Sequence, residues 1–95
     1  MVTAIVLLNV ERDATNRVAQ ALAQTDGISE VYSVAGRYDL AAIVRVSSNE
    51  GLAEVVTERI RGVKGIIASE TLISFRVFSK HDLDRMFAIG MDESK

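Results

Sequence analysis

Apolar residues fill the first predicted element, residues 3–10, which ends at the charged sequence Glu11-Arg12-Asp13. Both alternating faces of this run are apolar, which is typical of a strand covered on both sides. One face carries Ala4, Val6, Leu8 and Val10, and the other carries Ile5 and Leu7. The pattern therefore predicts a buried strand at this position.

Apolar residues then recur at helical spacing in two separate stretches. The first stretch contains Ala14, Val18, Ala21 and Leu22, and the second contains Leu52, Val55, Val56 and Ile60. Asp13 precedes the first stretch as its expected N-cap, and Gly27 follows it as its expected left-handed ending. Ser47 and Glu50 have capping-box spacing before the second stretch, and Gly62 follows it. We expect two amphipathic helices.

Between these helices, residues 28–35 and 40–46 alternate between apolar and polar positions. A short break, Gly36-Arg37-Tyr38-Asp39, separates the two runs, which is the signal of a β-hairpin. A long final strand is expected over residues 66–78. Ser79 and Asp82 repeat the capping spacing, so a short terminal helix is expected with Leu83, Met86, Phe87 and Met91 on its apolar side.

The predicted order is strand, helix, strand, strand, helix, strand, followed by an added helix. Two β-α-β halves joined by a hairpin form the ferredoxin-like α+β fold, with both helices on one face of a four-stranded antiparallel sheet. The other sheet face then carries apolar side chains that nothing in the chain covers, so we expect a dimer that packs sheet to sheet. We expect one domain over residues 1–95, with a core at 1–78 and the helix and tail at 79–95.

Composition removes several classes of protein. The 95 residues include no cysteine and one histidine, so we expect no disulfide, no metal site and no cofactor. The net charge is −2 and the basic residues are scattered, which argues against direct nucleic-acid binding. No apolar run approaches the roughly 20 residues of a membrane helix, so we expect a cytoplasmic protein without a membrane partner.

Candidate chemistry lies in the hairpin break and the final strand. Asp39 offers a carboxylate for the ammonium group of an amino acid. Ser69 and Thr71 are two residues apart, so their hydroxyls share one face and can donate to a ligand carboxylate. The plainer interpretation is that Asp39 satisfies turn amides and that both hydroxyls belong to ordinary strand residues.

Two segments resemble a known family. Residues 31–40, Val-Tyr-Ser-Val-Ala-Gly-Arg-Tyr-Asp-Leu, resemble the G-x-Y-D signature of the effector-binding (RAM) domain of Lrp/AsnC-type transcriptional regulators. Residues 65–73, Gly-Ile-Ile-Ala-Ser-Glu-Thr-Leu-Ile, resemble that family's G-V-x-x-T-x-T strand, with a serine at the first threonine. The resemblance covers nearly the whole chain.

The resemblance implies a dimer, and possible assembly of four dimers into an octameric ring. It also implies a small amino-acid effector bound between dimers, with contacts from Gly36, Arg37, Tyr38, Asp39, Ser69 and Thr71. The chain begins directly in its first strand, without the helix-turn-helix domain of full-length regulators. We therefore expect a stand-alone form that senses an amino acid and has a full-length regulator of the same type as a further candidate partner.

Other interpretations stay open. A small ferredoxin-like enzyme of the cofactor-free oxygenase or isomerase type would have to use Asp39, Tyr38 or His81, but no acid, base and orienting group come together in the sequence. A pure assembly module without a ligand is the third possibility. We expect a non-enzyme. Arg45 and Arg76 lie inside apolar strands, and structural pairing with Glu30 or Glu70, within the sheet or across a subunit boundary, is expected for both.

Overall fold

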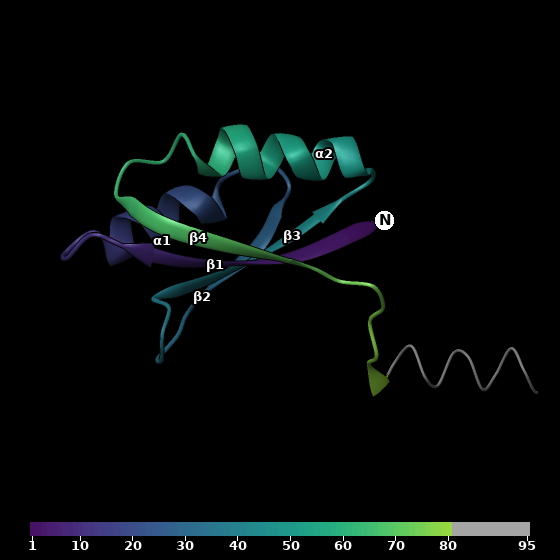
Figure 1. Ribbon diagram of the computed structural model, residues 1–95, viewed down its shortest axis with the longest axis horizontal. Helices are drawn as coiled ribbons and strands as arrows, with labels where there is room; N and C mark the ends of the chain where they lie inside the picture. The colour runs from purple at the N-terminus through teal and green to yellow at the C-terminus, as the bar shows by residue number, and fades with distance from the viewer. Residues whose placement is uncertain (81–95) are drawn as a thin grey trace, which may run out of the picture.

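The structure is a computed structural model that describes residues 1–80 (Figure 1). Its elements follow the predicted order. They are β1 (Val2–Val10), α1 (Thr15–Ala23), β2 (Ile28–Ser33), β3 (Leu40–Val46), α2 (Asn49–Glu54), the π-helical segment η1 (Val55–Ile60) and β4 (Ile66–Ile73). The predicted terminal helix over 79–95, including His81, lies outside the described residues apart from its first two positions.

The four strands form one antiparallel sheet in the order β2-β3-β1-β4. Both helices lie on the same side of this sheet, as Figure 1 shows, so the α+β ferredoxin-like architecture predicted from the sequence is confirmed. Strand β1 lies in the interior of the sheet, between β3 and β4, while β2 and β4 are the edge strands.

The core lies between the sheet and the helices. The structure shows which face of β1 lies against the helices, because Ala4, Val6 and Leu8 are completely buried. Val18 and Leu22 of α1 and Leu52, Val55 and Ile60 of the second helix pack in the same cluster. The opposite face of β1 is uncovered within residues 1–80, where Ile5 is 36% exposed, and its cover by a second copy stays a prediction.

The helix boundaries differ from the predicted ones by a residue or more. Asp13 does not cap α1; it adopts a left-handed conformation with φ 70°, and Ala14 occupies the N-cap position. The Ala14 N–H donates to the Glu11 carbonyl in a tight turn, which leaves Asp13 before the helix rather than at its start. Helix α1 ends with Gln24 as its C-cap, so Gly27 lies beyond the ending and instead leads into β2 with φ 94°.

The second helix is capped by Ser48 rather than by Ser47. The Ser48 hydroxyl accepts a hydrogen bond from the Gly51 N–H at 3.1 Å, which replaces the predicted pairing of Ser47 with Glu50. The three-residue spacing of a cap is kept, but it is shifted by one residue. Val55 continues the helix into the wider π-helical turn η1.

The final strand is shorter than predicted. It ends at Ile73 rather than at Phe78, and the Ser74 N–H makes one further bond, to the Thr3 carbonyl at 2.9 Å. The register limits the strand, because Ile73 lies opposite Ala4 and β1 begins at Val2, so only positions 74 and 75 have residues of β1 left to pair with. Residues 76–80 extend past the start of β1. Similarly, β2 ends at Ser33 rather than at residue 35.

Across residues 1–80, the helices are too short and too polar for any of them to cross a lipid bilayer.

Candidate functional site

The loop between β2 and β3 holds four of the predicted site residues. Its base is closed by two backbone bonds, from the Val34 N–H to the Asp39 carbonyl at 3.0 Å and from the Asp39 N–H to the Leu8 carbonyl at 2.9 Å. Gly36 at the tip has φ 134°, and nothing lies within 4 Å of the place where a side chain would begin. The tip backbone is therefore open to solvent and is shaped by a conformation that favours glycine.

Asp39 anchors this loop to the neighbouring strand. Its Oδ2 accepts a hydrogen bond from the Val10 N–H at 3.0 Å. Pairing between β1 and β4 shifts register between Asn9 and Val10, so this bond lies where the ladder is irregular. The Asp39 carboxylate thus has a structural role in the single chain, but its partner is an amide of β1 and not an amide of the turn, as the plainer interpretation predicted.

Tyr38 connects the loop to β4. Its hydroxyl donates to Glu70 Oε2 at 3.0 Å. This bond to a carboxylate stabilises the protonated phenol and raises the pKa of Tyr38, while the nearby charge of Arg37 acts in the opposite direction. Arg37 itself is exposed.

Ser69 and Thr71 lie on the other side of β4. They pair with Leu8 and Val6, whose side chains point toward the helices, and Glu70 between them pairs with Leu7 on the opposite face. The prediction that both hydroxyls share one face is confirmed. In one subunit, however, that face is opposite to the one on which Tyr38 meets Glu70.

Two adjacent cavities follow the groove between β4 and the second helix. One has a volume of about 280 Å³ and is lined by Val56, Ile60, Arg61, Ile66, Ile67, Ala68 and Ser69. The other has a volume of about 290 Å³ and is lined by Asn49, Leu52, Ala53, Val56, Thr57, Thr71 and Ile73. We call this pair the β4 groove. Ser69 and Thr71 each line one half of it, and Val56 of η1 lies between the halves.

The structure therefore groups the predicted site residues into two places. Gly36, Arg37, Tyr38 and Asp39 form the hairpin loop, while Ser69 and Thr71 lie in the β4 groove. Sequence reasoning did not assign Glu70, the Tyr38 partner, or Arg61 and Val56 in the groove. The strand alternation that paired Ser69 with Thr71 also places Glu70 on the opposite face, so this part of the site was open to prediction.

The sheet face away from the helices, which we call the open face, has no covering element among residues 1–80. Two rows of paired residues cross it, one with Glu30, Ile43, Ile5 and Leu72 and one with Tyr32, Ala41, Leu7 and Glu70. Arg45 lies 3.7 Å from Glu30 across this face, which confirms the expected pairing of Arg45. The bond from the Tyr32 hydroxyl to Glu30 at 2.8 Å raises the pKa of Tyr32.

Comparison with known proteins gives matches along most of the chain. The family model described as the Lrp/AsnC ligand-binding domain matches residues 3–83. HTH-type transcriptional regulators of Pyrococcus horikoshii and Pyrococcus furiosus are 36% and 34% identical over 76 residues, which is 77% of this chain and 51% of each regulator. The chain thus spans about half the length of these relatives.

Solved structures show the same fold. TTHA0845 from Thermus thermophilus is 39% identical, with a TM-score of 0.78, over 84% of this chain and 100% of that one. A feast or famine regulatory protein from M. tuberculosis, complexed with L-methionine, has a TM-score of 0.69 at 23% identity, over 84% of this chain and 54% of that one. With residues 3–83 matched by the family model, this chain belongs to the family of Lrp/AsnC ligand-binding domains.

Proposed function

We propose that this domain binds a small amino acid at a boundary between subunits, and that binding favours the assembly that completes the site. The observation that carries this proposal is that Tyr38 meets Glu70 on one face of the sheet whereas Ser69 and Thr71 lie on the other face. A ligand in contact with both the Tyr38 side of the loop and the Ser69 and Thr71 hydroxyls requires groups from two subunits. Such a ligand stabilises the assembled state by its differential affinity for it.

The two places offer complementary chemistry for an α-amino acid. The carboxylate of Asp39 suits the ligand ammonium, and its Oδ1 is unbonded among the described residues because only Oδ2 meets the Val10 N–H. The exposed loop backbone at Gly36 and the hydroxyls of Ser69 and Thr71 offer donors to a ligand carboxylate. Arg37 and Tyr38 complete the loop side of the proposed site.

Pairing of subunits through the open face is part of this proposal. Ile5 and Leu72 are 36% and 47% exposed there although both are large apolar side chains. Burial of such a face against a second copy removes apolar surface from water, which favours a dimer. Further assembly into an octamer would bring the loop of one dimer to the β4 groove of another.

The names of the similar proteins support a role in regulation as part of this proposal. The Pyrococcus proteins are named as HTH-type transcriptional regulators, and the M. tuberculosis neighbour was solved with L-methionine. We propose that this domain acts in transcription regulation together with a full-length regulator of the same family, in the cytoplasm and without catalysing a reaction.

Thermal unfolding in the presence of each of the twenty amino acids tests the ligand. A ligand at about 100 times its Kd adds roughly 2.7 kcal/mol to the free energy of unfolding, which is a clear rise in melting temperature for a small domain. We expect one or a few amino acids to give this rise. If no amino acid shifts the melting temperature, the sensor proposal is wrong and a pure assembly module replaces it.

Asp39→Asn is the sharper test of the site. An asparagine oxygen can still accept the Val10 N–H, so this variant keeps the loop anchor and removes the charge that the ligand ammonium requires. We expect a folded protein whose melting temperature no longer rises with the ligand. A rise as large as that of the unchanged protein would exclude Asp39 as the ammonium partner.

A further inference from the structure

Residues 74–80 follow β4 as a segment with an unusual apolar surface. Phe75 is 98% exposed, and Phe78 and Val77 are 74% and 55% exposed. The start of this segment is tied to the sheet by the bond from the Ser74 N–H to the Thr3 carbonyl at 2.9 Å. Two phenylalanines in water cost free energy unless another surface covers them. We call residues 74–80 the arm.

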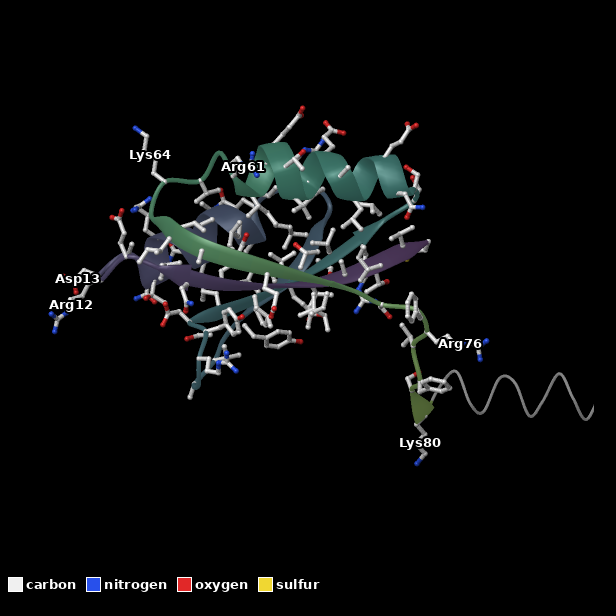
Figure 2. The ribbon with its side chains drawn as sticks, in the orientation of Figure 1. Arg12, Asp13, Arg61, Lys64, Arg76 and Lys80 are labelled. Carbon is white, nitrogen blue, oxygen red and sulfur yellow. The ribbon has the colours of Figure 1, made fainter. Side chains whose placement is uncertain are left out.

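The direction of the arm indicates where the surface that covers its two phenylalanines lies. In Figure 1 the arm turns away from the helices and runs past the end of the sheet toward the side of the open face. Figure 2 shows Arg76 and Lys80 on the arm, both directed away from the body of the domain. The arm therefore projects into the space in front of the open face, beyond the reach of its own sheet.

The charges of the arm and the open face are complementary. The arm carries Arg76 and Lys80, whereas the open face carries Glu30 and Glu70. Arg45 lies beside Glu30, but the bonded partner of Glu70 is the neutral hydroxyl of Tyr38. Among the described residues, Glu70 on the open face has no cation within ion-pair distance. Arg76 on the arm likewise has no carboxylate of these residues within ion-pair distance.

We propose that the arm of each copy packs on a second copy of this chain, with Phe75 and Phe78 against the β4 edge of the partner's open face and Arg76 beside Glu70 of the partner subunit. Because a two-fold dimer repeats every contact, two arms and two ion pairs form at once. This inference rests on the proposed sheet pairing and adds to it, since each subunit supplies residues that the partner's open face lacks. The Arg76 contact also reaches the carboxylate that holds Tyr38 of the ligand loop.

Sedimentation equilibrium of the full chain, over a range of concentration and salt, tests the arm. Phe75→Ser removes a side chain that makes almost no contact within its own subunit, so the fold is retained. We expect the dimer Kd to rise about tenfold or more, the effect of losing an anchor residue of an interface. Arg76→Glu should weaken the dimer to a similar degree, and most strongly at low salt.

A charge swap tests the pairing itself. In the double variant Arg76→Glu with Glu70→Lys, the opposite charges face each other again, and we expect recovery of most of the affinity lost in Arg76→Glu alone. Lys64→Glu is the control, since this cation lies at the other end of the domain (Figure 2), and its dimer Kd should not change.

The possible results separate the proposals. If the unchanged protein stays monomeric at all concentrations, both the sheet pairing and the arm contact are wrong. If it dimerises but neither Phe75→Ser nor Arg76→Glu raises the Kd, the arm proposal is overturned, and Leu72→Ala tests the sheet pairing by itself. If the swap recovers nothing, Arg76 does not pair with Glu70. The amino-acid proposal is judged separately by the melting temperatures.

Discussion

The Tyr38 hydroxyl donates a hydrogen bond to Glu70 Oε2 at 3.0 Å, joining the hairpin loop to the edge strand β4 across 32 positions of the sequence. Glu70 stands between Ser69 and Thr71, so the same strand presents its carboxylate to one side and its two hydroxyls to the other. This alternation places the Glu70 carboxylate and the two hydroxyls on opposite faces within a subunit, which is why the proposed site draws on two subunits.

The hydrogen bond between Tyr38 and Glu70 predicts a raised pKa for the Tyr38 hydroxyl. Because the bond needs the protonated phenol and raises its pKa, the stabilisation is complete below the ordinary tyrosine pKa of about 10 and is lost as pH rises through the higher pKa of the folded state. We expect Glu70→Gln to lower the pKa of Tyr38, measured by the ultraviolet absorbance of tyrosinate. The chain has two tyrosines, so Glu30→Gln, which acts on Tyr32, identifies the second transition. An unchanged titration in both variants would contradict these hydrogen bonds.

Asp39→Ala should destabilise the free protein. The change removes the acceptor of the Val10 N–H, a bond between a charged group and a half-buried amide, and we expect a loss of about 1–2 kcal/mol in urea unfolding. Asp39→Asn should lose clearly less because it keeps an acceptor at this position. Equal losses in the two variants would show that the charge, rather than the hydrogen bond, anchors the loop.

Thr71→Val tests the strand side of the proposed site. Valine has nearly the same shape as threonine, and Thr71 lies in the β4 groove as a half-buried residue, so the variant should remain folded. We expect the melting-temperature rise caused by the amino acid to disappear or to shrink strongly. Thr57→Val, on the helix side of the same groove, is the matched control and should keep the rise. Loss of the rise in both variants alike would point to a general effect on the groove.

Gly36→Ala and Gly27→Ala should lower the free energy of unfolding by different amounts. Gly36→Ala meets no atom within 4 Å, so its cost comes from φ 134° alone and should be about 1–2 kcal/mol. Gly27→Ala combines φ 94° with a Cβ position 2.6 Å from Val55 Cγ2, and overpacking adds about 1–3 kcal/mol. Chemical denaturation measures both losses. A larger loss in Gly36→Ala than in Gly27→Ala would show that the loop tip, rather than the helix–sheet contact, limits stability.

Leu8→Ala and Leu72→Ala test the two faces of the sheet, one against the helices and one open. Leu8 is completely buried under the helices, so Leu8→Ala should cost about 3 kcal/mol at every protein concentration. Leu72 is 47% exposed on the open face, so Leu72→Ala should cost little in a dilute monomer and should weaken the dimer instead. Unfolding at low and high protein concentration separates the two effects. A concentration-independent loss for Leu72→Ala would contradict sheet pairing.

Much of the fold follows from local patterns. Alternation and helical spacing were enough to predict the order of the elements, and β3 (Leu40–Val46) has the predicted bounds. The errors lie at element ends, where tertiary contacts decide. Asp13 lost its capping role to a turn at Glu11, and β4 could not reach Phe78 because the strand beside it begins at Val2.

The sequence by itself determined the fold class and the two motifs that carry the family resemblance, because each depends on residue type and spacing along a few consecutive turns or strand pairs. Only the tertiary structure decided what those motifs face. The register between β1 and β4 sets Ser69 and Thr71 against the helices and Glu70 toward Tyr38, and it carries residues 76–80 past the start of β1. A hairpin turn fixes the register of the strands that it joins, but β1 and β4 are far apart in the sequence, so their register depends on how the sheet and helices pack together.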